Sequence, residues 1–122
     1  LPLSEAGVDI FHCSQRRFWE PEFEGSELNL AGWTRKITGK PAITVGSVGL
    51  NADFIPVPGE VTFREAEPAS LDELERRLSD NEFDLVAVGR ALISNPSWVD
   101  MIRDDRSDDI KPFRKEHLGQ LV

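Results

Sequence analysis

The stretch DLVAVGRALISNP, residues 84–96, places an apolar run directly before a Gly-Arg pair and the start of a helix pattern. A second stretch, AITVGSVGL at residues 42–50, also ends an apolar run at glycine, but it has no arginine. A short apolar run that stops at glycine is typical of a buried strand leading into a loop. The two stretches predict strands at residues 84–88 and 42–46, and they raise the question of why an arginine ends one of them.

Strand and helix patterns also alternate before these stretches. An apolar run predicts a strand at residues 8–13. Residues 27–38 then predict a helix with apolar side chains near one face, and Gly39 with Pro41 predicts its end.

The two later helices have start signals of their own. Residues 71–80 carry leucines at helical spacing, and Ser70 with Glu73 predicts a capping box at the first turn. A last helix is predicted to begin near Pro96, a residue that suits a first helical turn.

The strands are short and apolar on both faces, which is typical of parallel strands buried under helices. Strand–helix units lie near residues 8–38, 42–81 and 84–103, and a tail follows at 104–122. Such units predict an α/β fold with right-handed crossovers between parallel strands. We expect residues 1–122 to form a single partial domain of this class.

Composition excludes several classes of function. The 122 residues are 39% hydrophobic and 30% charged, as in an ordinary globular domain. A net charge of -8 disfavours binding to nucleic acid or to an anionic membrane, and no apolar run is long enough to span a bilayer. The single cysteine, Cys13, fits a cytoplasmic protein. The first residue is Leu1 rather than methionine, so we expect a piece of a larger protein.

Two long connections interrupt the regular pattern. Residues 14–26 carry three aromatic side chains, and residues 51–69 are longer than an ordinary link between a strand and a helix. Pro58 and Gly59 favour a small hairpin in the second connection. The tail carries three apolar side chains that predict a terminal element packed on the surface: Phe113, Leu118 and Leu121.

Glycines at the carboxyl ends of parallel strands let the backbone approach an anionic ligand. The predicted phosphate site combines Gly46 and Ser47 at one strand end with Gly89 and Arg90 at the next. Backbone N–H groups would converge there, and Arg90 would add a positive charge with two parallel donors. The alternative is that these glycines only form turns and that Arg90 is a solvated surface residue.

The other reactive side chains predict neither a metal site nor a nucleophile. His12 and His117 lack Cys or carboxylate neighbours at metal-binding spacing. The acidic run at residues 104–109 lacks the glycine and the final Glu of a calcium loop. Cys13 is expected to be a small buried hydrophobic residue.

Four stretches carry a resemblance to a known family. DLVAVGRALISNPSWV, GKPAITVGSVGL, AGVDIFHCSQRRFWEPEFEGS and the final IKPFRKEHLGQLV resemble the old yellow enzyme family of FMN-dependent NAD(P)H:flavin oxidoreductases. The first three are similar to successive strands with their following segments, and the last is similar to the family's C-terminal segment. The resemblance covers almost the whole chain.

The resemblance implies a (β/α)₈ TIM barrel, of which these residues would be the last three βα units, with FMN at the C-terminal mouth. It also implies a reaction in which NADH or NADPH reduces the flavin and hydride then passes to an activated alkene or a similar acceptor. A whole barrel needs on the order of 250 residues, so this chain covers only part of one.

Two groups of residues acquire roles from the resemblance. The FMN phosphate would be bound by Gly46, Ser47, Gly89 and Arg90. The substrate side of the flavin would be covered by a loop that contains Phe18, Trp19 and Phe23. The family's substrate-binding His/Asn or His/His pair and its proton-donating Tyr lie earlier in the barrel. This sequence has no Tyr, and His12 does not match the pair. We therefore expect no catalytic residue here and no activity from this piece alone.

Two other functions fit the same residues. One is a module that binds a phosphorylated ligand without chemistry, and the other is part of a barrel that binds a sugar phosphate. In each case the expected ligand is a small molecule. Three parallel strands leave two unpaired edges, which predicts either an oligomer or association with the remainder of a barrel.

Overall fold

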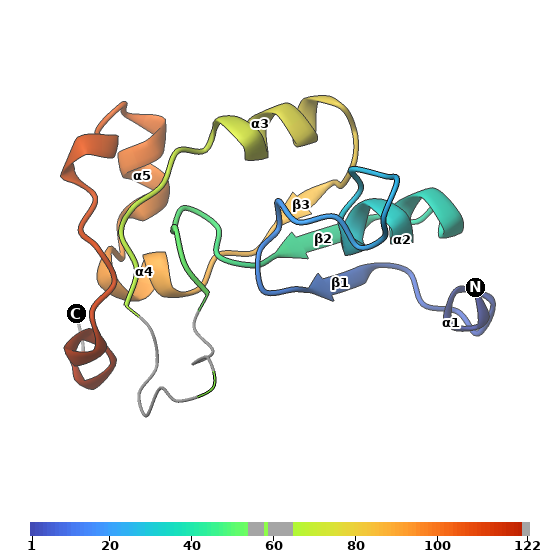
Figure 1. Cartoon of the computed structure of the whole chain (residues 1–122), viewed down its shortest axis with the longest axis horizontal. Helices are drawn as coiled ribbons and strands as arrows, with labels where there is room; N and C mark the ends of the chain where they lie inside the picture. The colour runs from blue at the N-terminus through green and yellow to red at the C-terminus, as the bar shows by residue number, and fades with distance from the viewer. Residues whose placement is uncertain (54–57, 59–64, 121–122) are drawn as a thin grey trace. The chain divides into compact units, whose positions relative to one another are not determined.

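The computed structural model of the chain describes residues 1–53, 58 and 65–120. These residues belong to two compact units (Figure 1). Unit 1 comprises Leu1–Gly46 and Leu71–Ala87, and unit 2 comprises Ser47–Ser70 and Val88–Val122. That residues 1–122 form one partial domain stays a prediction.

Unit 1 is built on a parallel sheet in the order β1 (Phe11–Ser14), β2 (Ala42–Val45) and β3 (Leu85–Val86). The three arrows point the same way in Figure 1, and the register places Thr44 of β2 opposite Cys13 on one side and Val86 on the other. The α/β class with parallel strands is therefore confirmed.

The first and last strands are shorter than predicted. The amide of Val8 donates to the carbonyl of Leu3, in the turn that follows α1 (Pro2–Glu5), so β1 starts only at Phe11. At the other end, the register of β3 with β2 ends at Val86 and Thr44, one residue before β2 itself ends, and the amide of Ala87 still donates to the carbonyl of Thr44.

Helix α2 (Leu30–Thr38) packs against β1 and β2. It begins three residues later than predicted, because the side chain of Asn29 accepts the amide of Gly32 at 2.8 Å and so caps the first turn. The predicted stop is confirmed: Gly39 follows the helix with a left-handed φ of 69° and donates its amide to the carbonyl of Arg35.

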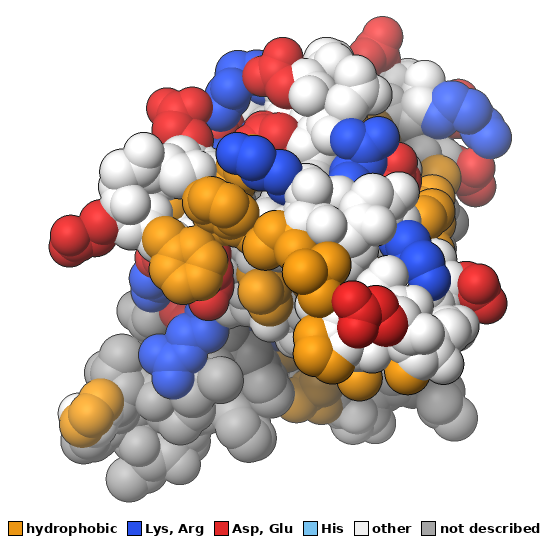
Figure 2. All heavy atoms as spheres, turned by 90° about the vertical axis from the view of Figure 1, so that its right-hand side faces the viewer, with side chains coloured by type: hydrophobic (Ala, Val, Ile, Leu, Met, Phe, Trp, Pro, Cys, Tyr) orange, Lys and Arg blue, Asp and Glu red, His pale blue; other side chains and the backbone are white. Residues whose placement is uncertain are grey.

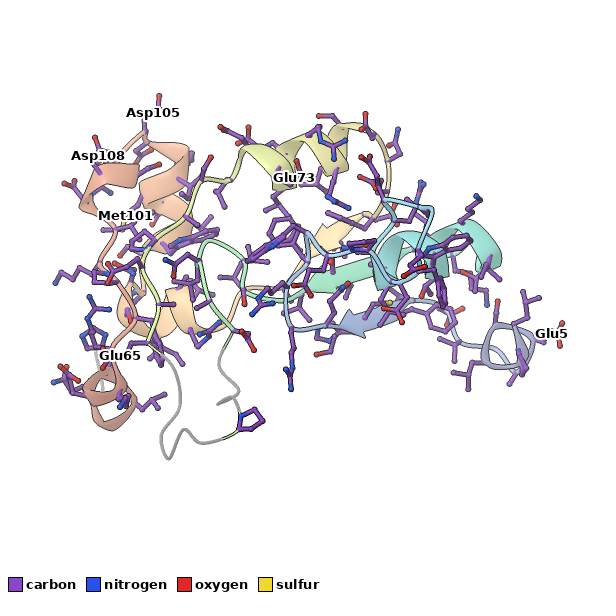
Figure 3. All side chains as sticks on the ribbon, viewed as in Figure 1. Glu5, Glu65, Glu73, Met101, Asp105 and Asp108 are labelled. Atoms are coloured by element: carbon purple, nitrogen blue, oxygen red, sulfur yellow. The ribbon has the colours of Figure 1, made fainter. Side chains whose placement is uncertain are left out.

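Helix α3 (Asp72–Ser79) lacks the predicted capping box. Leu71 takes the N-cap position without a capping side chain, and the carboxylate of Glu73 accepts hydrogen bonds from Arg76 and Arg77 instead. The capping-box prediction is wrong because these guanidinium groups are charged donors, and a carboxylate binds them more strongly than it binds a backbone amide. Glu73 is labelled on α3 in Figure 3.

Only one face of the sheet is buried in the described residues, although both faces were predicted to be. Cys13, Ala42 and Thr44 are buried on the face that α2 covers. The other face carries Leu85, which is 52% exposed, and Ile10, which precedes β1 and is 44% exposed. The apolar pattern was interpreted correctly as strand, but nothing in the described part of unit 1 covers this second face.

Exposed hydrophobic side chains are a wider feature of unit 1. Figure 2 shows hydrophobic side chains gathered on one face of the molecule between basic and acidic ones. The large exposed hydrophobic residues of unit 1 are Leu1, Leu3, Ile10, Phe23, Ile37 and Leu85.

Unit 2 contains α4 (Arg90–Ser94), α5 (Trp98–Arg103) and the short 3-10 helices η1 (Ser107–Asp109) and η2 (Lys115–Gly119). The predicted last helix starts at Trp98 rather than at Pro96, because the side chain and backbone of Asn95 instead form the link from α4. Helix α4 was not predicted. The core of the unit is apolar and consists of Val48, Leu50, Ala66, Ala91, Trp98 and Phe113.

The tail of the chain takes part in this core. Phe113 is fully buried and forms an antiparallel bridge with Ala66, whereas Leu118 is exposed. Leu121 and the predicted hairpin, apart from Pro58, lie outside the described residues. Within the described ranges, no helix has the length and hydrophobicity to cross a membrane.

Candidate functional site

The two strand-end glycines have different surroundings. Gly46 directly follows β2 in unit 1 and has a φ of 153°. There is no room for a side chain at this position, because a Cβ atom would lie 2.4 Å from the carbonyl oxygen of Gln15. Its own carbonyl accepts the amide of Phe18 at 3.0 Å. Glycine is therefore required at position 46 because another segment of backbone crosses directly over it.

Gly89 in unit 2 has open space instead. A Cβ atom built on it meets no heavy atom within 4 Å, and the residue is exposed. Its carbonyl accepts the amide of Leu92 at 2.9 Å, so Gly89 leads into α4. The backbone beside Gly89 can accordingly be approached by a ligand.

The VGSVG segment makes a tight turn at the start of unit 2. Ser47 has a φ of 53°, and its carbonyl accepts the amide of Leu50 at 3.1 Å. Val48 and Leu50 are buried, and Gly49 lies so close to the indole of Trp98 that a Cβ atom would be 3.0 Å from Cζ2. The turn is thus held in place by the core of the unit.

Arg90 brings the two predicted motifs together within unit 2. Its Nη2 atom donates to the carbonyl oxygen of Ala52 at 2.6 Å and lies 3.3 Å from the hydroxyl of Ser47. The guanidinium carbon lies 5.5 Å from the centre of the Phe113 ring, within the range of a cation–π contact. Arg90 is therefore packed against the VGSVG turn and is only partly exposed to solvent.

Burial and a nearby carboxylate have opposite effects on the charge of Arg90. Burial lowers the pKa of Arg90, because removing the cation from water disfavours its charged form, while the nearby carboxylate of Asp53 opposes that shift. Asp53 is itself buried. A positive group held in this way can bind an anion, but Asp53 repels that anion, so backbone N–H groups must contribute to binding as well.

The predicted substrate-side loop belongs to unit 1. Phe18 is buried, and its ring meets that of Trp19 edge-on with 5.3 Å between the ring centres. Phe23 is 57% exposed and stands edge-on to Trp33 of α2. Phe18 thus contributes to the core and Phe23 faces solvent. The assignment of all three aromatic residues to a substrate side stays a prediction.

A buried arginine that no sequence pattern marked contacts this loop. Arg77 of α3 is only 4% exposed, and it donates to the backbone carbonyls of Trp19 at 3.2 Å and Glu27 at 2.9 Å. The available signal was its position three residues after Leu74, on the buried stripe of the helix. A charged residue on such a stripe calls for buried partners, which the sequence does not identify.

The remaining candidate residues are Cys13, His12 and His117, and each has different surroundings. The thiol of Cys13 is buried and lies 3.5 Å from the hydroxyl of Thr34. His12 is exposed on β1, and His117 pairs with the hydroxyl of Ser94 at 2.8 Å. Across the described residues, no three His, Cys, Asp or Glu side chains are grouped so that they could hold a metal ion.

The chain was compared with protein-family models and with known proteins. No family model matches the chain. The chain is 32% identical over 125 residues to a protein named NADH oxidase from Thermoanaerobacter brockii. The match includes 96% of this chain but only 16% of that relative, so the chain corresponds to a small part of it.

Proposed function

We propose that the chain forms the phosphate-binding end of a flavin site in an oxidoreductase that takes hydride from a nicotinamide cofactor. The name of the relative, an NADH oxidase, supports NADH as the reductant. The parallel α/β architecture and the four stretches that resemble the old yellow enzyme family support FMN as the flavin. The proposal allows either NADH or NADPH as the reductant.

The observation that carries the proposal is the contact between Arg90 and the VGSVG turn. Nη2 of Arg90 and the hydroxyl of Ser47 lie 3.3 Å apart, so a cation and a neutral donor stand side by side in unit 2. Gly89 adds a backbone that a ligand can approach. A phosphate binds well to such a set because its oxygens accept charge-assisted hydrogen bonds from a guanidinium group and ordinary ones from backbone N–H and hydroxyl groups.

These donors fit the phosphate of FMN. Ser47, Gly89 and Arg90 of unit 2 would bind it, and a contribution from Gly46, which ends the first segment of unit 1, stays a prediction. The phosphate would offset the cost of burying Arg90, and the backbone donors would compensate for repulsion by Asp53. When bound, FMN would supply the hydride-transfer chemistry between the reductant and an activated alkene or similar acceptor.

We also propose that the three strands are the last three of a (β/α)₈ barrel. In a closed barrel, the inner face of every strand is covered by side chains from the other strands. The exposed face of the sheet, with Leu85 half in solvent, supports a neighbour of this kind. The remainder of the barrel would then be the partner that covers this face and pairs with the strand edges.

Absorbance and turnover test the function. Together with the remainder of the proposed barrel, the chain is expected to absorb between 350 and 500 nm from bound flavin and to oxidise NADH or NADPH in the presence of an enone. A colourless protein that binds phosphorylated sugars would favour a sugar-phosphate barrel instead. A protein that binds a phosphorylated ligand without consuming either nicotinamide cofactor would be a binding module. Either result would overturn the proposal.

Replacing Arg90 tests the site itself. Arg90→Ala is expected to weaken FMN binding by about 1.5–3 kcal/mol, the usual range for a hydrogen bond to a charged group. This corresponds to a dissociation constant raised roughly 10- to 150-fold. Arg106→Ala is the matched control, because Arg106 is an exposed arginine of the same unit with only a 3.9 Å ion pair to Asp104. Equal FMN affinity in both variants would remove Arg90 from the site.

A further inference from the structure

Arg77 is a buried cation whose hydrogen bonds are directed at a single loop. Its Nη1 and Nη2 atoms donate to the carbonyl oxygens of Glu27 and Trp19, and its Nε donates to the carboxylate of Glu73 at 2.8 Å. A second carboxylate oxygen, from Glu82, lies 3.6 Å from Nη1. One guanidinium group on α3 thus joins two points of a loop that lies some fifty residues earlier in the chain.

The aromatic loop, defined here as residues 15–29, has its other anchors at its two ends. The amide of Phe18 donates to Gly46, and the buried side chain of Asn29 donates to the carbonyl of Phe18 at 2.9 Å. Between these ends, the loop leaves at Trp19 and returns at Glu27. Arg77 contacts both of these positions, so it fixes the spacing between the outgoing and returning arms.

The choice of arginine at this position is costly for stability alone. Position 77 lies on the buried stripe of α3, where a leucine or methionine would bury apolar surface without desolvating a charge. The nearby acid groups show the effect of this environment: burial raises the pKa of Glu82, whereas hydrogen bonds from Arg76 and Arg77 lower the pKa of Glu73 to about 2. What arginine adds over an apolar residue is a rigid set of donors that can bind two carbonyls and a carboxylate at once.

We propose that Arg77 is a positioning residue that sets the shape of the aromatic loop on the substrate side of the flavin. The placement of the loop on the substrate side rests on the proposed function. The clamp, meaning the hydrogen bonds from Arg77 to the carbonyls of Glu27 and Trp19, rests on those contacts alone. Arg77 would act through the backbone of the loop and not on the reacting atoms themselves. Its effect on catalysis would be transmitted through the backbone of Trp19 and Glu27 to the exposed aromatic residue of the loop, Phe23.

The test compares Arg77→Met and Arg77→Lys with the control Arg76→Lys. Arg76 is the neighbouring arginine on α3, and its guanidinium group donates to Glu73 and to Asp80 at the end of the helix. The control therefore tests loss of a guanidinium group whose hydrogen bonds are directed at its own helix and not at the loop. Arg77→Lys keeps the charge but cannot reach all three acceptors in the same geometry. It therefore provides a variant that folds even where Arg77→Met does not.

Hydrogen exchange is the first readout. The amide of Glu22 is bonded to the carbonyl of Leu28 inside the loop, and the amide of Trp33 is bonded to Asn29 in the first turn of α2. In both Arg77 variants, exchange at Glu22 is expected to accelerate by about tenfold or more, with exchange at Trp33 unchanged, because local opening reports the lost loop contacts. An unchanged exchange rate at Glu22 would overturn the proposal that Arg77 restrains the aromatic loop.

Steady-state kinetics with NADH and cyclohexenone is the second readout. The KM for cyclohexenone is expected to rise about fivefold or more in the Arg77 variants, with FMN affinity unchanged and kcat changed less than KM, since the loop would shape binding rather than hydride transfer. Faster exchange with an unchanged KM would overturn the substrate-side role. These kinetics use the chain assembled with the remainder of the proposed barrel. If that unaltered assembly turns over no cyclohexenone, the proposed function fails and the substrate-side role fails with it, whereas the exchange data still decide whether Arg77 restrains the loop.

Discussion

Gly46→Ala is expected to destabilise the protein strongly, whereas Gly89→Ala is not. The two glycines look alike in the sequence, since each follows a short apolar strand. In the structure, a Cβ atom at position 46 would lie 2.4 Å from the carbonyl oxygen of Gln15 and 3.1 Å from the amide nitrogen of Phe18. A Cβ atom at position 89 would meet no heavy atom within 4 Å.

The expected free-energy cost of Gly46→Ala combines two unfavourable contributions and a smaller favourable one. A φ of 153° is unfavourable for a residue with a Cβ atom by about 1–3 kcal/mol. Overlap with the backbone adds about 1–3 kcal/mol. Relief is not available from Gln15, because its amide donates to Val45 and its side chain bonds both Leu30 and Glu20. Reduced entropy of the unfolded chain offsets only about 0.4–1 kcal/mol, so the net loss is about 1–6 kcal/mol.

Urea denaturation of the unaltered protein and the two variants measures this difference. With a slope of about 1–3 kcal/mol per molar urea, the midpoint of Gly46→Ala is expected to fall by roughly 1 M or more, and that of Gly89→Ala by much less. Gly89→Ala should instead weaken FMN binding, because its methyl group would occupy the space beside the proposed phosphate. A Gly46→Ala midpoint equal to that of the unaltered protein would refute the close crossing of residues 15–18 over β2's end.

Two further outcomes are expected. Asn29→Ala should lower the free energy of unfolding by about 2–3 kcal/mol, because it removes a helix cap and leaves the buried carbonyl of Phe18 without its donor; thermal unfolding checks this, and an unchanged midpoint would contradict it. Because hydrogen bonds from the two arginines lower the pKa of Glu73 to about 2 in the folded protein, the ionised carboxylate stabilises the fold above about pH 4.5, and this contribution is lost as the pH falls towards 2. Glu73 is 42% exposed, so solvent screening reduces the effect, and Glu73→Gln should flatten the stability curve between pH 2 and 5; a curve that keeps its slope would contradict the assignment.

Much of unit 1 could be predicted because its signals are local. Apolar runs bounded by glycine located all three strands, and Gly39 marked the end of α2 in the left-handed conformation that favours glycine. The parallel arrangement followed from the alternation of strand and helix patterns, which leaves room for a helical crossover and none for a hairpin. The bounds were less accurate, since strand ends depend on pairing with a distant segment and not on where the apolar run ends.

The features that sequence reasoning missed depend on contacts between distant segments. A Cβ atom at position 46 would meet the backbone of Gln15 and Phe18, a close approach that the sequence does not mark. Arg77 lies on the stripe predicted to be apolar, and its partners are backbone carbonyls, which every residue possesses and no sequence pattern marks. The capping box failed because Glu73 had two charged donors close by.

The predicted phosphate site likewise contains residues that the sequence identified and a residue that it did not. Sequence pattern alone identified Ser47 and Arg90 as residues at neighbouring strand ends, and the structure brings their side chains to 3.3 Å within unit 2. The buried carboxylate of Asp53 beside Arg90 was not foreseen, because its position depends on how the connection after β2 turns back.

Comparison of FMN with riboflavin tests the phosphate site most directly, since the two flavins differ only by the phosphate group. Dissociation constants for both flavins would be measured in the unaltered protein, in Arg90→Ala and in the control Arg106→Ala. We expect FMN to bind more tightly than riboflavin in the unaltered protein and in the control, and Arg90→Ala to reduce this preference by roughly 10- to 150-fold. An FMN preference that is the same in all three proteins would contradict the assignment of Arg90 to the phosphate.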